Sequence, residues 1–153
     1  MSESVSIKQA LEKSGVISIN PKGQSMFPFI KEGDTAIIKA PTAPLKKYDC
    51  VLFVEDENTC VLHRLIKIKG DALTTVGDNN LKPDRPLKSN EVIGVLEGIY
   101  KRNGKYVGIY GKKPSVSVVL GCFYPFKRIR LFYYRCRRFI SRLFKRSGGG
   151  SGV

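Results

Sequence analysis

The sequence contains only one histidine, no Cys-x-x-Cys pair and no long run of apolar residues. The four cysteines, at positions 50, 60, 122 and 136, do not have the spacing of a zinc site, so neither a metal nor an organic cofactor is expected. No apolar stretch approaches the roughly 18 residues that a membrane-spanning helix needs. The first 25 residues lack a basic start followed by an apolar run, which argues against a secretory signal. These absences predict a cytoplasmic protein.

Acidic residues are absent from the C-terminal third of the chain. All 13 of them lie within residues 1–97 together with 13 of the 27 basic residues, so this part carries no formal net charge. Residues 98–153 therefore hold the entire net charge of +14. A neutral body argues against a nucleic-acid-binding core, whereas a uniformly basic segment indicates an anionic partner.

Short β-rich runs dominate the middle of the chain. Clusters of Pro, Gly, Asn and Asp separate them, which is typical of a mainly β, coiled antiparallel domain. The predicted strands are 35–39, 50–54, 60–68, 72–76, 92–96 and 106–110. Residues 5–14 contain good helix formers and stop at Gly15, which predicts a short N-terminal helix. Asn103 and Gly104 predict a hairpin turn between the last two strands.

A chain of 153 residues is long enough for one compact domain with an appendage. We expect four parts: a helix and lead-in over 1–22, a catalytic β domain over 23–112, a basic amphipathic tail over 113–146, and a flexible linker or cloning remnant over 147–153. Within the hairpin of strands 50–54 and 60–68, Cys50 is expected to face Arg64 and Val54 to face Cys60. A Cys50–Cys60 disulfide would then be strained, which favours free thiols in a reducing compartment.

The tail changes to a helical period. Apolar residues recur every three or four positions from Phe126 to Phe144, and residues 123–146 contain nine basic residues, which predicts a basic amphipathic helix over about 123–146. Such a helix would suit an anionic membrane surface, and the protein is then expected peripherally on the inner face of the membrane. Nucleic acid is a rival anion but is not expected, because the apolar stripe favours lipid. The remaining alternative is that the stripe packs on the β domain.

The most informative segment is 23–34, GQSMFPFIKEGD, because it places Ser25 in a turn directly before a predicted strand. A serine hydroxyl needs a base within hydrogen-bonding reach to act as a nucleophile, and His63 is the one imidazole in the chain. Taken alone, Ser25 is more readily explained as a turn residue, and His63 as a histidine at the edge of the core.

Four short motifs follow one another in order. They are G-x-S-M-x-P with G-D at 23–34, YDCV at 48–51, LHRL at 62–65, and GDNN at 77–80 with Asp84 beyond it. This series resembles the type I signal peptidase family, and specifically its endoplasmic-reticulum-type branch, in which a histidine replaces the lysine base of the usual bacterial enzymes. The resemblance covers residues 20–98 and implies a coiled β domain that cleaves a leader or signal peptide after small residues.

The resemblance also implies the roles of particular residues. Ser25 is the expected nucleophile, His63 the general base and Asp84 the carboxylate that holds the imidazole. Asp78 is the alternative for that carboxylate, although a turn-capping aspartate is its simpler explanation. Asn79, in the loop that would shape the site, and Arg64, next to the base, are expected to support it.

The substrate cleft is expected around the nucleophile. Bacterial relatives with a lysine base often carry a hydroxyl two residues before the serine, but Gly23 stands there in this chain. The oxyanion hole would then consist of backbone amides, and Gly23 would allow the chain to approach the oxyanion closely. Met26 and Pro28 are expected to form the floor and turn of the cleft, although Met26 alone is equally consistent with core packing.

Two other functions remain open. A self-cleaving repressor-type peptidase shares the fold, but that function expects a lysine base and a DNA-binding domain upstream, and only 24 residues precede Ser25. The other alternative is a catalytically silent peptide- or membrane-binding module with the same fold. No membrane anchor is recognised within residues 1–22, so the expected substrate is a leader-bearing peptide in the cytoplasm.

Overall fold

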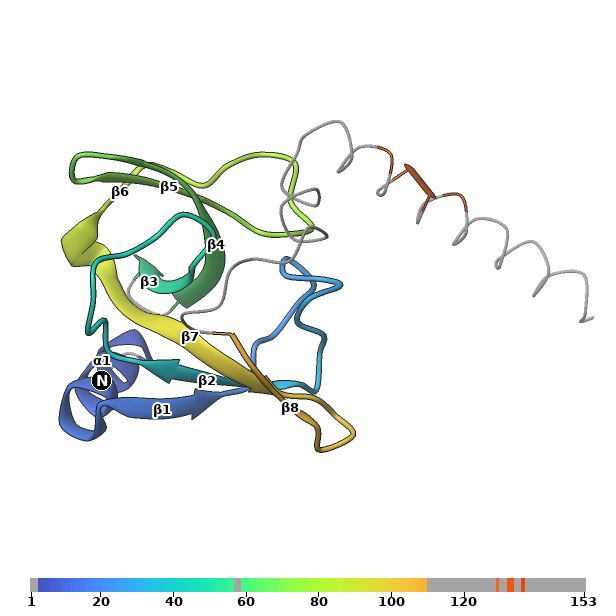
Figure 1. The fold of residues 1–153 in the computed structure, drawn as a ribbon, viewed down its shortest axis with the longest axis horizontal. Helices are drawn as coiled ribbons and strands as arrows, with labels where there is room; N and C mark the ends of the chain where they lie inside the picture. Colours follow the sequence, from blue (N-terminus) through green and yellow to red (C-terminus); the bar gives the residue numbers. More distant parts are fainter. Residues whose placement is uncertain (1–2, 57–58, 110–128, 130–131, 134–135, 137–153) are drawn as a thin grey trace, which may run out of the picture.

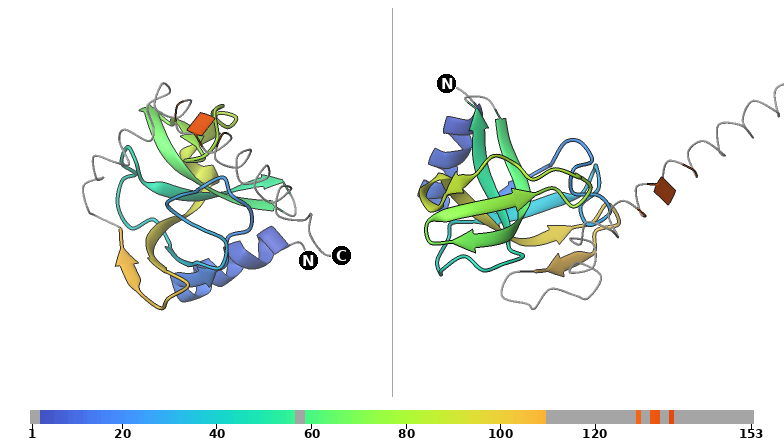
Figure 2. Two further views of the ribbon diagram at one scale, coloured as in Figure 1. Left: turned by 90° about the vertical axis from the view of Figure 1, so that its right-hand side faces the viewer. Right: turned by 90° about the horizontal axis from the view of Figure 1, so that it is seen from above.

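A computed structural model describes residues 3–56, 59–109, 129, 132–133 and 136. One antiparallel sheet makes up most of these residues. The elements are α1 (Glu3–Ser14), β1 (Val16–Ile19), β2 (Thr35–Lys39), β3 (Cys50–Asp56), β4 (Thr59–Lys69), β5 (Ala72–Val76), β6 (Leu87–Lys88), a 3-10 turn (Ser89–Glu91), β7 (Val92–Tyr100) and β8 (Tyr106–Gly108). The strand order is β1-β2-β7-β3-β4-β5-β6, and β8 pairs with β7. The sheet is strongly curved (Figures 1 and 2). The prediction of a mainly β, antiparallel fold is confirmed.

The helix α1 ends where the sequence predicts. Gly15 has a φ of 72°, a conformation that favours glycine, and its amide donates to the carbonyl of Leu11 at 2.8 Å. The helix packs against β1, β4 and β7, and Leu11 is buried in the core. Within the described residues, no helix is long and apolar enough to cross a bilayer.

Strand β3 lies in the middle of the sheet and is buried on both faces. Its side chains alternate between two apolar clusters, because successive residues of a strand point to opposite faces. Cys50 and Leu52 join the cluster that also contains Met26 and Leu11, whereas Val51 and Phe53 join a second one. The first four residues of β3 are therefore all buried, and in the sequence they form one continuous apolar run.

The β3–β4 hairpin has the expected register. Cys50 lies opposite Arg64 and Val54 opposite Cys60, so the two cysteines are not cross-strand neighbours. The Asn103–Gly104 turn is also confirmed, with Gly104 at a φ of 78°. His63 and Arg64 lie at the centre of β4. The ladder between β4 and β5 begins at Arg64, so His63 is the last residue of β4 before it.

Two strands escaped the sequence analysis. Strand β1, at the edge of the sheet, has four residues and pairs with β2 alone among the described strands, and β6 has two residues. The part of the expected lead-in that forms β1 thus belongs to the same sheet as the rest of the β domain. The predicted tail helix lies almost wholly outside the described residues, but Ile129, Phe132, Tyr133 and Cys136 are helical.

Candidate active site

The segment that carries Ser25 connects β1 to β2. It is closed by short-range hydrogen bonds, in which the amide of Phe27 donates to Gln24 at 3.1 Å and the amide of Ile30 donates to Met26 at 2.9 Å. Met26 is only 4% exposed and packs in the same cluster as Leu52, so it anchors this segment to β3. Ser25 itself is half-buried.

His63 and Asp84 meet although 21 residues separate them in the sequence. The imidazole Nδ1 of His63 lies 2.7 Å from Oδ2 of Asp84, and the two side chains are 7% and 15% exposed. The same Oδ2 accepts a hydrogen bond from Oγ1 of Thr75 at 2.7 Å, and the amide of Asp84 donates to the carbonyl of Thr75 at 3.0 Å. Asp84 is thus held in place by β5 from two sides.

This contact determines which nitrogen of His63 can act as a base. A carboxylate only accepts hydrogen bonds, so Nδ1 carries the proton in the neutral imidazole and Nε2 keeps its lone pair. Nε2 is buried and has no hydrogen-bond partner among the described residues. The arrangement can therefore remove a proton from a hydroxyl that reaches Nε2.

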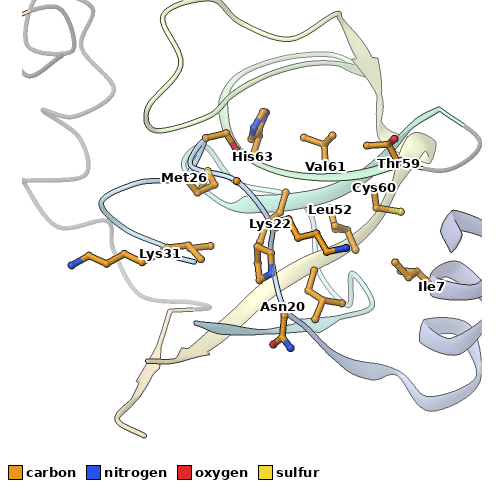
Figure 3. Close-up of a pocket in the computed structure, with 16 residues that line it drawn as sticks. Ile7, Asn20, Lys22, Met26, Lys31, Leu52, Thr59, Cys60, Val61 and His63 are labelled. Carbon is orange, nitrogen blue, oxygen red and sulfur yellow. The ribbon is translucent and has the colours of Figure 1, made fainter. Parts of the chain in front are cut away.

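Ser25 and His63 line one groove, drawn in Figure 3, with a volume of about 690 Å³. The structure thus brings all three predicted residues to one place, since Asp84 lies behind His63. No hydrogen bond joins the Ser25 hydroxyl to Nε2. Such bonds are often long in unliganded enzymes and shorten when a substrate is bound.

The loop at 77–80 contacts Ser25 through the backbone. The amide of Asn79 donates to the carbonyl of Ser25 at 2.7 Å, and the amide of Asn80 donates to Gly77 at 2.9 Å. A Cβ at Gly77 would lie 2.7 Å from the Ser25 carbonyl oxygen, so only glycine allows this approach. The expectation that this loop shapes the site has a physical basis in these contacts.

Asp78 binds Arg64 and not His63. Its two carboxylate oxygens accept hydrogen bonds from Nε and Nη2 of Arg64 at 2.8 and 2.7 Å, and both side chains are buried. Nη1 of Arg64 donates to the carbonyl of Tyr48 at 3.0 Å, where Tyr48 has a φ of 79°. Of the two carboxylates considered from the sequence, Asp84 is the one beside the imidazole.

A third carboxylate fixes the other end of the segment that carries Ser25, residues 20–34. Asp34 is 2% exposed; its Oδ2 lies 2.9 Å from Nζ of Lys101 and accepts from the amide of Lys31 at 3.0 Å. Burial alone would raise the pKa of Asp34. The hydrogen bond and charge of Lys101, together with the amides of Lys31 and Arg102, outweigh burial and hold the pKa below its ordinary value.

The remaining predicted cleft residues have different positions. Gly23 lines the groove at a φ of 83°, with open space where a Cβ would stand, so its conformation and not crowding requires glycine. Met26 both lines the groove and packs in the core, so its two explanations, as a cleft residue and as a core residue, are compatible. Pro28 lies in the same turn but is exposed and is not among the described groove-lining residues.

Sequence reasoning missed Thr75 and Lys101. Thr75 is completely buried in β5, but this burial is a property of the fold, so the sequence offered no signal for it. Lys101 gave no signal, because its partners Phe29 and Asp34 lie 72 and 67 residues away.

A comparison with protein families matches residues 2–97 to the model of the Peptidase S24-like family. A comparison with curated proteins finds no match. The family match covers more than half of the chain and includes the nucleophile segment, the β3–β4 hairpin and the 77–84 loop. The chain therefore belongs to the Peptidase S24-like family, whose members are generally serine peptidases.

Proposed function

We propose that this protein is a serine endopeptidase of the signal peptidase type, which cleaves a leader or signal peptide after small residues. Ser25 is the nucleophile, His63 the general base and Asp84 the carboxylate that orients it. The observation that carries the proposal is that Asp84 holds Nδ1 of His63, that Nε2 is buried and unbonded among the described residues, and that His63 lines the same groove as Ser25. The endoplasmic-reticulum-type branch is the one that uses a histidine base.

The proposed reaction follows from these positions. Nε2 of His63 takes the proton from Oγ of Ser25 as Oγ attacks the peptide carbonyl carbon, and the resulting imidazolium is stabilised by Asp84. The imidazolium then gives this proton to the leaving amine as the C–N bond breaks, which leaves an acyl-enzyme on Ser25. A water molecule, deprotonated by the same nitrogen, hydrolyses the ester.

The oxyanion would be bound by backbone amides. Gly23 stands where a second hydroxyl is found in lysine-based relatives, and its open surroundings leave room for the tetrahedral carbon. The amide of Ser25 is the proposed donor.

An extended peptide fits the shape of the groove. Its wall from β4 consists of Thr59–His63, while the ladder with β5 begins only at Arg64. A substrate that runs along this stretch would add to the sheet as a further strand, and main-chain hydrogen bonds would then provide affinity without regard to sequence. The preference for small residues before the cut rests on the resemblance to signal peptidases.

The self-cleaving repressor-type function belongs to the same family fold and is the second candidate. It expects lysine as the base, whereas the side chain next to Asp84 is His63. Intact mass of the purified protein after incubation separates the two functions, because self-cleavage yields two fragments and a signal peptidase type leaves the chain whole.

The central experiment compares the wild-type protein with Ser25→Ala. We expect the wild type to cleave leader-type peptides with small residues before the cut and to be acylated by a serine-directed probe, whereas the variant does neither. Ser25 is half-buried, so its loss leaves stability nearly unchanged. Cleavage by Ser25→Ala at the wild-type rate would remove the mechanism, and a wild type that neither cleaves nor is labelled would indicate a silent binding module.

We also propose that residues 123–146 attach the protein to an anionic membrane surface. Ile129 and Tyr133, on the predicted apolar stripe, are 65% and 59% exposed. About 1 kcal/mol for each basic residue near an anionic leaflet is enough for peripheral binding. Flotation with liposomes rich in anionic lipid should retain the full chain and lose a variant without residues 123–146; equal flotation of both would contradict membrane attachment through the tail.

A further inference from the structure

The groove beside Ser25 is lined by four parts of the protein. Residues 19–23 and 25–26 form one wall and residues 59–63 of β4 form the other, with Leu52 of β3 between them and Ile7 of α1 at one end (Figure 3). Most of the side chains that line it are apolar, among them Ile19, Met26, Val61 and Leu62. The groove therefore favours a largely apolar extended peptide.

Its charged side chains are all of one sign. Two lysines, Lys22 and Lys31, are among the described lining residues, and no Asp or Glu is. The side chain of Lys31 points away from the other labelled residues in Figure 3, and its ammonium lies 5.9 Å from the centre of the Phe27 ring. Lys22 is thus the cation that a peptide in the groove would meet.

Two carboxylates beside the site are already engaged. Asp84 lies against His63 and Thr75, and Asp34 against Lys101. Because neither lines the groove, neither neutralises Lys22 locally, although the first 97 residues as a whole carry no net charge.

We propose that the groove selects peptides with an acidic side chain close to the cut, and that Lys22 recognises this side chain. The inference rests on the proposed peptidase function. The β4 wall of the groove extends four residues from His63 to Thr59, or about 13 Å at roughly 3.3 Å per residue. An extended peptide that is cut beside His63 has about four residues within this length, so we expect the acidic residue within about four positions of the cut, on one side.

Charge complementarity also excludes one occupant. The chain's own residues 98–153 contain 14 basic residues and no acidic one, so this segment would be repelled by Lys22. Residues 98–153 are therefore not the acidic peptide that the proposal requires.

The experiment uses alanine-rich peptides that carry one Glu, Gln or Lys at each of four positions on either side of the cut. For the wild type we expect kcat/KM for the best Glu peptide to exceed that for its Gln counterpart by about fivefold at low salt, the size of an exposed ion pair. The preference should decrease at high salt because the ammonium is exposed to solvent. In Lys22→Glu it should reverse in favour of the Lys peptide.

Lys67→Glu is the matched control. It makes the same change of net charge at an exposed position of β4 outside the groove, so it should keep the wild-type preference. A preference that is absent in the wild type, or that Lys67→Glu reverses as strongly as Lys22→Glu, would overturn the inference.

A binding measurement separates this inference from the proposed function. Ser25→Ala, and Ser25→Ala combined with Lys22→Glu, are titrated with the same peptides carrying a rhodamine label. A preference for Glu that Lys22→Glu reverses supports the inference even if the wild type cleaves nothing. Cleavage that depends on Ser25 but shows no charge preference supports the proposed function and contradicts the inference. The absence of any peptide binding also contradicts the inference.

Discussion

Two adjacent residues of β4 each bind a carboxylate from the segment 77–84, with different consequences. His63 lies against Asp84, and Arg64 lies against Asp78, at the same closest distance of 2.7 Å. The guanidinium uses two nitrogens and cannot give up its proton, so the Arg64–Asp78 pair is a permanent link. The imidazole uses one nitrogen, and its Nε2 has no partner among the described residues. Similar geometry thus provides a structural link on one residue and, under the proposed function, a proton carrier on the next.

Both ion pairs lie close to Ser25. Asp78 fixes the loop whose next amide, that of Asn79, donates to the carbonyl of Ser25. Asp84 fixes the imidazole that faces the groove. We infer that one pair positions the nucleophile and the other activates it, and isosteric substitutions of the two aspartates distinguish these roles.

The largest effect is expected for Asp84→Asn. The amide can donate to Nδ1, which stabilises the tautomer with the proton on Nε2, and the imidazolium loses its counter-charge. Peptide cleavage should decrease by a factor of about 10³ to 10⁴, by analogy with other Ser-His-Asp sites. The measurement is kcat at saturating peptide, and Asp71→Asn, on the exposed turn before β5, is the control. A loss of less than tenfold would show that His63 works without Asp84.

A large effect on stability is expected for Asp78→Asn. Asp78→Asn removes the carboxylate charge opposite the buried Arg64 and should lower the free energy of unfolding by about 3 kcal/mol. Cleavage by the folded fraction should decrease by less than tenfold, because no proton passes through this pair. Urea unfolding and kcat at low temperature are the measurements. Stability equal to the wild type with a rate as low as that of Asp84→Asn would reverse the two roles.

The pattern of local residues predicted much of this arrangement. Alternation and turn residues placed most strands, and the register that sets Cys50 opposite Arg64 followed from the hairpin. The order of motifs pointed to His63 and Asp84, which the structure brings together, while their catalytic roles remain a prediction. The pairing of Asp78 with Arg64 was not predicted, because a short aspartate after a glycine has the composition of an ordinary turn.

Contacts between distant parts of the chain were beyond the sequence. Strand β1 pairs only with β2, so its existence depends on a partner about 20 residues away and not on a long periodic run. Thr75 became recognisable as a partner of Asp84 only once the sheet placed it there. Local propensity contains no information on such pairings.

The smallest effect on stability is expected for a third ion pair, Asp34 with Lys101, whose lysine is partly exposed to solvent. The lysine is 28% exposed and also donates to the carbonyl of Phe29, so it ties the end of the nucleophile segment to β7. Asp34→Asn should lower the free energy of unfolding by about 1 to 2 kcal/mol at pH 7, since charge-assisted hydrogen bonds are lost. Urea unfolding of both proteins is the measurement.

The pH dependence of that difference tests the cause. The pKa of Asp34 is lower in the folded protein than its ordinary value of 3.8, so the unfolded chain takes up the proton first as the pH falls. The contribution of Asp34 is therefore complete above about pH 5 and is lost as the pH falls through the folded pKa, below 3.8. The stability curves of the wild type and Asp34→Asn should run parallel from pH 7 to about pH 5 and converge below pH 4. A gap that stays constant down to pH 3 would mean that Asp34 acts by shape and not by charge, and the link to Lys101 would then resemble an ordinary neutral hydrogen bond.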